Sequence, residues 1–313
     1  MVWGGERIAP YKGIKTDAKH IGESWEISGY REHETVVSEG PLAGKTISEV
    51  AKEFKGELLG EHVYASTGDE FPLLIKFIDA LTDLSIQVHP NDEMAVRCHG
   101  EGARGKTEMW YVIAAAPGAK LYAGLRKQLS PEEYEKMVAD GTITDALACY
   151  EVKPGDVFFL PAGRIHAICG GCLIAEIQQT SDITYRIWDY GRLGLDGKPR
   201  QLHTELAKQA IDFKVYDNYR TEYTPVKDEE VEVVSCPYFT TSIYDLTLPY
   251  ARDLSDIDSF MVVICVEGRG TLEVDGKSLD IRQGETVLIP ASADDLCFIP
   301  EDGGMKLVTS YVR

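Results

Sequence analysis

The sequence predicts a mainly β fold made of two jelly-roll domains, with a small helical insertion in the first domain. Most of the chain consists of short β-rich runs that are bounded by Gly, Pro and Asp residues. Few stretches have a helical period, and one strand-and-corner motif occurs twice along the 313 residues. We expect the first domain to span residues 1–215 and the second to span residues 216–313.

The predicted strands are runs of β-branched and aromatic residues with turn residues on either side. A hairpin is predicted where Asp275 and Gly276 separate two such runs, because this dipeptide favours a tight two-residue turn. Short strands, a hairpin and proline-containing corners are typical of the double-sheet jelly roll of cupins. The runs lie at residues 112–113, 157–160, 173–177, 260–266, 271–274 and 286–289.

Two stretches carry helical signals. In residues 46–54 the apolar side chains recur at intervals of three or four, as on one face of a helix. A second helix is predicted to begin at Ser130, a good N-cap that is followed by Pro131 and two glutamates. A further short helix is expected near residues 144–148, so we place helical segments of the first domain near 46–54 and 130–148.

The motif that repeats reads PGDVFFLPA at residues 154–162 and QGETVLIPA at residues 283–291. Each copy has a turn glycine, an acidic residue, a buried strand and a Pro-Ala corner. Two unrelated strands with similar turns would look alike in part, but a match over the whole element favours duplication. The first copy continues to His166, whereas the chain has no histidine after His203. We therefore expect the chemistry in the first domain, and a second domain without metal ligands.

The net charge of −19 argues against nucleic acid or a membrane surface as a partner, because both are themselves anionic. Salt screens exposed charges, so a cluster of cations in a cleft can still hold a phosphate. Seven cysteines without a framework spacing indicate reduced thiols. The N-terminus does not resemble a signal peptide, and the longest apolar stretch is too short to cross a bilayer. These features predict a cytoplasmic protein.

Four residues have the side chains of a metal site, and a lysine lies at the same spacing beside them. Gln87 and His89 are two residues apart, as are Lys106 and Glu108, so each pair shares one face if both segments are strands. His166 follows the first Pro-Ala corner and can close such a site. Taken alone, His89 is more simply explained as a buried core histidine. The combination with Gln87, Glu108 and His166 favours a bound metal.

Several motifs together resemble those of type I mannose-6-phosphate isomerase, in its short bacterial form. Any one of them alone would be weak, whereas the combination is specific. The resemblance extends from the WGG of residues 3–5 through the second copy of the repeat. Its motifs are QVHPND at 87–92, GKTEMWYVI at 105–113, PAGRIHA at 161–167, EIQQTSDITYR at 176–186 and YGR at 190–192.

The resemblance implies an isomerase that interconverts mannose 6-phosphate and fructose 6-phosphate through an enediol, with a sugar phosphate as its small-molecule partner. It implies one Zn²⁺ per chain, held by Gln87, His89, Glu108 and His166. It also places an active-site arginine at Arg186, where the alternative is a surface ion pair.

Lys106 and Glu176 are both candidates for the residue that carries the proton, and the sequence does not decide between them. Arg192 follows Gly191, and a phosphate contact and a structural contact are equally compatible with that position. The residues that would bind the phosphate group are not identified by the sequence.

Two other functions remain open on chemical grounds. Two histidines and a carboxylate with open positions also describe the iron site of a non-haem cupin oxygenase. A second alternative is a cupin that binds sugar without catalysis. The oligomeric state is not defined by the sequence, and a monomer is compatible with it. Cys169 and Cys172 are expected to flank a tight turn with both thiols reduced.

Overall fold

The computed structural model describes residues 1–194 and 196–313. Its chain divides into two compact units by the contacts between residues. The first unit comprises Met1–Pro10, Lys15–Ser24 and Lys76–Thr221, and the second comprises Tyr11–Ile14, Trp25–Ile75 and Glu222–Arg313. Among the described residues, no helix has the length and apolarity that a membrane crossing requires.

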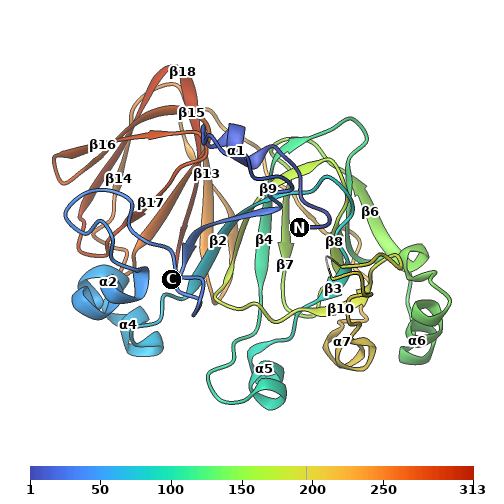
Figure 1. Cartoon of the computed structure of the whole chain (residues 1–313). Helices are drawn as coiled ribbons and strands as arrows, with labels where there is room; N and C mark the ends of the chain where they lie inside the picture. Colours follow the sequence, from blue (N-terminus) through green and yellow to red (C-terminus); the bar gives the residue numbers. More distant parts are fainter. Residues whose placement is uncertain (195) are drawn as a thin grey trace. The chain divides into compact units, whose positions relative to one another are not determined.

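Two sheets face each other in the first unit, as expected for a jelly roll (Figure 1). Buried side chains of one sheet, such as Trp110 and Phe158, pack against Leu121 and Ile168 of the other. A six-stranded sheet, of which residues 25–28 and 73–75 are counted with the second unit, has the order β1 (Glu23–Ser28), β2 (Leu73–Asp79), β9 (Cys172–Gln179), β4 (Glu108–Ala115), β7 (Val157–Leu160) and β11 (Arg220–Thr221). A five-stranded sheet has the order β10 (Tyr185–Trp188), β3 (Ile86–Val88), β8 (His166–Ile168), β5 (Lys120–Leu125) and β6 (Leu147–Glu151).

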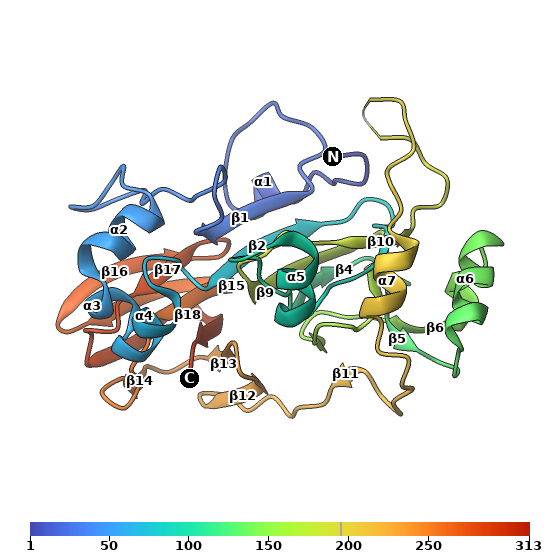
Figure 2. The same ribbon diagram turned by 90° about the horizontal axis from the view of Figure 1, so that it is seen from below.

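Short helices connect these strands. The predicted helix start at Ser130 is confirmed, because its side chain accepts from the Glu133 N–H and Glu133 bonds back to the Ser130 N–H. The expected helix near residues 144–148 is wrong in part, since one 3₁₀ turn ends at Ala146 and Leu147 begins a strand. In Figure 2, α7 lies beside β10. The helices are α1 (Ile8–Tyr11), α5 (Asp92–His99), α6 (Pro131–Ala139), η1 (Ile143–Ala146) and α7 (Thr204–Ala210).

The second unit is built on a seven-stranded antiparallel sheet. Its predicted hairpin is confirmed: Asp275 and Gly276 both have positive φ and join Val274 to Lys277. The predicted helix at 46–54 is also confirmed, with Thr46 as its cap. The strands are β12 (Glu230–Ser235), β13 (Thr240–Leu246), β14 (Tyr250–Asp253), β15 (Met261–Val274), β16 (Lys277–Arg282), β17 (Thr286–Ile289) and β18 (Asp295–Tyr311), and the helices are α2 (Ile47–Phe54), α3 (Gly56–Leu59) and α4 (Glu61–Thr67).

The two copies of the repeated motif have the same backbone hydrogen bonds. In the first, Gly155 N donates to Val112 O over 2.8 Å, and Val112 N donates to Asp156 O over 2.9 Å. In the second, Gly284 N donates to Cys265 O over 2.9 Å, and Cys265 N donates to Glu285 O over 3.0 Å. Both glycines have a positive φ, a backbone conformation that would be strained for a residue with a side chain. This identity of local structure supports the duplication that the sequence predicts.

The compact units divide the chain at different places from the two predicted domains. The first unit ends at Thr221 rather than at residue 215, because β11 pairs with β7. The helix Ile47–Phe54 belongs to the second unit, although the sequence analysis placed it in the first domain. The assignment of catalysis to residues 1–215 stays a prediction.

Candidate metal centre

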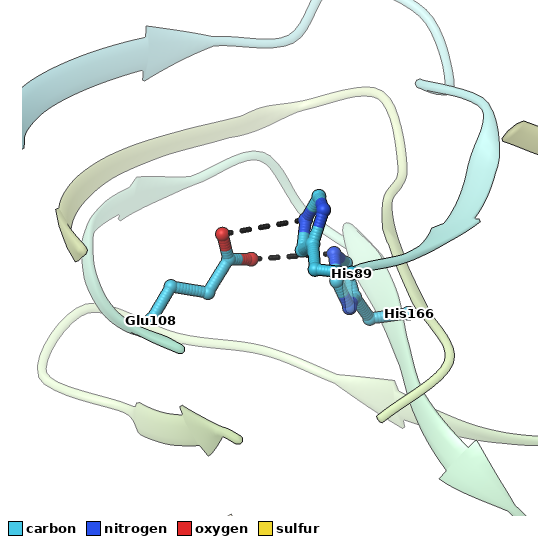
Figure 3. A group of neighbouring side chains, drawn as sticks. All are labelled: His89, Glu108 and His166. Atoms are coloured by element: carbon cyan, nitrogen blue, oxygen red, sulfur yellow. Dashed lines mark ion pairs between the residues drawn. The ribbon is translucent and has the colours of Figure 1, made fainter. Parts of the chain in front are cut away.

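Strand alternation brings three potential ligands to one point between the two sheets of the first unit. Glu108 opens β4 on the same face as the core residue Trp110, while His166 opens β8 in the opposite sheet. His89 follows β3 directly. The three side chains converge in Figure 3, and one ligand atom of each lies within 4.8 Å of the others. Glu108 Oε2 is 3.5 Å from His89 Nε2, and Glu108 Oε1 is 3.2 Å from His166 Nε2.

Backbone carbonyls fix the orientation of both imidazoles. His89 Nδ1 lies 2.8 Å from Ile183 O, and His166 Nδ1 lies 2.8 Å from Arg164 O. A carbonyl only accepts, so each Nδ1 carries the proton and each Nε2 presents a lone pair to Glu108. Burial, with a further contribution from the charge of Lys106, holds the pKa of His89 well below its usual range. Burial also lowers the pKa of His166 to about 4. Both rings are therefore neutral at physiological pH, as metal-binding histidines must be.

Three ligand atoms at the centre of this cluster have no hydrogen-bond partner within the described part of the chain, and the nearest cation is Lys106, whose Nζ lies 3.2 Å from Glu108 Oε2. These atoms are Nε2 of His89 and both carboxylate oxygens of Glu108, which is 0% exposed. A buried carboxylate in this state is costly unless a cation compensates its charge. Burial and then the charge of Glu176 raise the pKa of Glu108 to about 8. Two neutral imidazoles and one buried carboxylate thus fit a divalent metal ion.

The predicted ligand Gln87 lies next to this cluster. It pairs with His166 across β3 and β8, so the two side chains share a face of the sheet. The amide Nε2 of Gln87 is 3.3 Å from His166 Nε2. Rotation of the amide would present its oxygen at the same position. The structure therefore brings all four predicted ligands together, and their role as ligands stays a proposal.

Arg186 enters the same face from the neighbouring strand. It lies directly opposite Gln87 in the pairing of β10 with β3. Its Nη1 donates to Gln201 O over 3.0 Å, while its buried Nε has no hydrogen-bond partner among residues 1–194 and 196–313. Burial and then the positive charge of Arg200 lower the pKa of Arg186. An arginine stays protonated even so.

Arg192 and Arg200 are held together by one carboxylate. Nε of Arg192 lies 3.0 Å from Asp189 Oδ1, and Nε of Arg200 lies 2.7 Å from Asp189 Oδ2. Each arginine also donates an Nη2 to Asp189 Oδ1 over 2.6 Å. Two guanidiniums therefore share a single aspartate. This part of the first unit is locally positive in a chain whose net charge is −19.

Known proteins resemble this chain over its whole length. Residues 1–110 match the family described as phosphomannose isomerase type I, catalytic domain, and residues 229–312 match the family described as mannose-6-phosphate isomerase, cupin domain. The mannose-6-phosphate isomerase of Streptococcus mutans is 33% identical, with 99% of this chain and 94% of that protein aligned. The chain belongs to the type I mannose-6-phosphate isomerase family. The resemblance that the motifs indicated is thereby confirmed.

Two further members of the isomerase family agree with this assignment. Mannose-6-phosphate isomerase ManA of Bacillus subtilis is 32% identical over 92% of this chain and 89% of its own length. The crystal structure of the mannose 6-phosphate isomerase from Bacillus subtilis superimposes with a TM-score of 0.88 at 32% identity, covering 100% of this chain and 96% of that one. The predicted mainly β cupin fold is therefore confirmed.

The proton-carrying candidates of this isomerase-family chain lie beside the metal cluster. Lys106 is 4% exposed, and its Nζ is 3.2 Å from Glu108 Oε2. Burial alone would lower the pKa of Lys106, but the carboxylates of Glu108 and Glu176 outweigh it and hold this pKa above its usual value. For Glu176 burial would raise the pKa, but Lys106, Lys76 and a Trp110 hydrogen bond lower it. In the absence of a metal both groups are therefore charged.

Sequence reasoning missed two residues of this network, Lys76 and Trp110. Lys76 is 3% exposed, with its Nζ 3.8 Å from Glu176 Oε1 and 3.9 Å from Glu23 Oε2. Trp110 Nε1 donates to Glu176 Oε2 over 2.8 Å, and its ring meets His166 edge-on at 5.2 Å. A signal was present for Lys76, because a lysine inside an otherwise apolar strand requires a buried partner.

The turn at Cys169 and Cys172 matches its prediction. Gly171 has a φ of 95° in this turn, between β8 and β9. Across the described residues every cysteine is a free thiol. We therefore assign no chemistry to this pair.

Proposed function

We propose that the protein interconverts mannose 6-phosphate and fructose 6-phosphate with one Zn²⁺ held by Gln87, His89, Glu108 and His166. The observation that carries the proposal is the buried Glu108 carboxylate, which faces the Nε2 atoms of two neutral imidazoles and has Lys106 Nζ 3.2 Å away. The family to which the chain belongs, and the names of its relatives, indicate the sugar phosphate. Mixed nitrogen and oxygen donors suit zinc, and a catalytic site keeps one position open.

The reaction moves a proton between C1 and C2 of the open-chain sugar through an enediol. Zinc, when bound, supplies a Lewis acid that stabilises negative charge on the sugar oxygens. The protein must supply a base for the carbon-bound proton and a donor for the oxygens. Glu176 is the proposed base, because its lowered pKa keeps the carboxylate ionised at neutral pH. Lys106 is the proposed donor, because its raised pKa keeps the ammonium protonated.

Arg186 is proposed to stabilise the enediolate oxygens. Its buried Nε has no hydrogen-bond partner among the described residues, so an oxygen of the substrate can supply one. Its place opposite Gln87 supports this role, because the guanidinium and the proposed metal ligand share one face of the sheet. Arg192 and Arg200 offer further donors to a phosphate group, since one aspartate cannot neutralise both.

The two alternatives fit the site less well. A non-haem iron oxygenase keeps open positions for oxygen and substrate, and a fourth ligand from Gln87 would occupy one of them. A cupin that only bound sugar would have no need of the buried Lys106 and Glu176 charges next to the ligand cluster. The relatives described above are all named as mannose-6-phosphate isomerases, and none is named as an oxygenase or a sugar-binding protein.

A coupled assay that follows fructose 6-phosphate formation tests the proposal. The protein is stripped with a chelator and then reloaded with zinc or with ferrous iron under air. We expect isomerisation to return with zinc and no oxygen uptake with iron. Oxygen uptake by the iron-loaded protein would favour the oxygenase, and an inert zinc-loaded protein would favour the sugar binder.

A further inference from the structure

The backbone of Arg186 is held by a histidine that lies outside the sheet. β10 is an edge strand, so one side of it has no strand to pair with. On that side Arg186 N–H donates to Nδ1 of His203 over 3.1 Å, and Arg186 C=O accepts from the His203 N–H over 2.7 Å. Both outward-facing backbone groups of Arg186 are therefore satisfied by one residue, 17 positions further along the chain.

A side chain is needed here because the carbonyl of His203 is already engaged. His203 is the residue before α7, and its C=O accepts from Ala207 N over 2.8 Å in the first turn of that helix. A regular strand neighbour would offer its carbonyl to the Arg186 N–H. His203 has turned into the helix at this point, so its imidazole replaces the carbonyl as acceptor.

The imidazole of His203 is itself fixed in the state that this bond requires. An Nδ1 that accepts from an N–H must be unprotonated, so the proton of the neutral ring sits on Nε2. Burial, and then the positive charge of Arg186, lower the pKa of His203, which favours the neutral ring. The Tyr185 ring lies 6.2 Å from the imidazole, and its hydroxyl is 3.0 Å from His99 Nε2.

We propose that His203 is a positioning residue for Arg186 and acts through its Nδ1 acceptor. The segment 201–203 holds Arg186 at three points: its N–H, its C=O and, through Gln201 O, its guanidinium Nη1. This arrangement keeps the Arg186 side chain on the face of the sheet that carries Gln87 and His166. The inference rests on the proposed function, because it assumes that Arg186 acts on the substrate.

Two substitutions at position 203 separate the acceptor from the rest of the ring. In His203→Asn the amide oxygen takes the place of Nδ1, whereas in His203→Gln the amide lies near the place of Nε2 and the acceptor is lost. We expect H203Q to lower kcat about tenfold or more, as small displacements of a catalytic group do, with little change in KM. H203N should retain most of kcat. Zinc content and Tm, measured on both variants, should stay close to wild type.

A double-mutant cycle then tests whether His203 acts through Arg186. If it does, H203Q lowers kcat in the wild-type background, whereas the double variant has the same kcat as Arg186→Ala alone. Equal losses in both backgrounds, or equal losses in H203N and H203Q, would overturn the proposal. Wild-type kcat in R186A alone would instead refute the assumed role of Arg186.

An independent readout needs no activity. With ¹⁵N-labelled histidine, the spectrum of His203 at neutral pH should show an unprotonated Nδ1 and a protonated Nε2, in both the zinc-loaded and the metal-free protein. The opposite tautomer would overturn the proposal even in a fully active enzyme. If the protein is inactive but shows the expected tautomer, the contact between His203 and Arg186 is supported and the proposed function is contradicted.

Discussion

Arg186 on β10 lies directly opposite Gln87 on β3, and both backbone polar groups of Arg186 turn away from that pair toward His203. Opposed residues that exchange no backbone hydrogen bonds bring their side chains nearer than hydrogen-bonded pairs do. The Arg186 side chain therefore leaves the sheet beside the side chain of a proposed metal ligand. Charge stabilisation by Arg186 and by the metal would act on adjacent atoms of one substrate.

Replacing Arg186 with alanine should lower kcat by roughly 10²–10³-fold, because one preorganised donor to a developing negative charge is lost. Zinc content and Tm should change little, since Arg186 is not one of the proposed ligands and is only half-buried. Arg269→Ala is the matched control, because Arg269 is 69% exposed and forms an exposed ion pair with Glu301. A rise in KM alone would make Arg186 a residue of uniform substrate binding.

Zinc affinity should increase with pH up to about 8. The metal-free Glu108 has its pKa raised to about 8 by burial, so metal binding below that pH must displace a proton. His89 and His166 add little, because burial keeps their pKa values low and their rings neutral. Calorimetric titration should show the zinc Kd falling by about tenfold per pH unit between pH 6 and 8 and then levelling. A Kd independent of pH over this range would contradict the role of Glu108.

The raised pKa of Glu108 also makes the metal-free protein less stable as pH rises. The folded-state pKa of Glu108 lies above its unfolded value of 4.5, so its contribution is fully present below pH 4.5 and lost as pH rises through about 8. We expect added zinc to raise Tm more at pH 8 than at pH 6. Equal zinc-dependent increases in Tm at the two pH values would argue against this linkage.

Trp110→Phe should change the pH dependence of catalysis without removing the metal. The substitution deletes the N–H that donates to Glu176, and that bond lowers the pKa of Glu176. The acid limb of the kcat/KM profile should therefore move to higher pH. Trp3→Phe serves as the control, because Trp3 is buried in the same core cluster. An unchanged acid limb in the Trp110 variant would exclude Glu176 as the base.

His166→Ala should abolish tight zinc binding and turnover together. Loss of a ligand should weaken binding by more than the roughly 10–100-fold that loss of a supporting hydrogen bond costs. His33→Ala is the control, because His33 is an exposed histidine outside the first unit. Retention of one metal per chain by the His166 variant, measured by metal analysis, would remove His166 from the ligand set.

Local signals in the sequence predicted several elements correctly. The capping signal at Ser130, the helical period of residues 46–54 and the Asp275–Gly276 turn each depend on neighbouring residues only, and all three are present in the structure. The repeated motif also has the same backbone bonds in both copies. The helix Asp92–His99 was missed although Asn91 and two acids mark its start, because its eight residues carry little apolar period.

The site could be predicted only in part, because the spacing of residues within one segment does not show which distant segments pair with it. The Gln87–His89 and Lys106–Glu108 spacings predicted that each pair shares one face and that His166 could close the site, whereas the zinc ligand set came from the family resemblance. The contact of His203 with Arg186 depends on where α7 begins beside β10. No spacing rule in a single sequence indicates such a contact. Lys76 was detectable as a charge in an apolar strand, but its partner Glu176 lies a hundred residues away.

The most direct test is metal analysis of the purified protein together with the isomerase assay, before chelation, after chelation and after zinc is restored. We predict one zinc per chain, loss of mannose 6-phosphate isomerisation when the metal is removed, and recovery when it returns. Full activity in the metal-free protein, or no isomerisation by a protein that holds its zinc, would contradict the account.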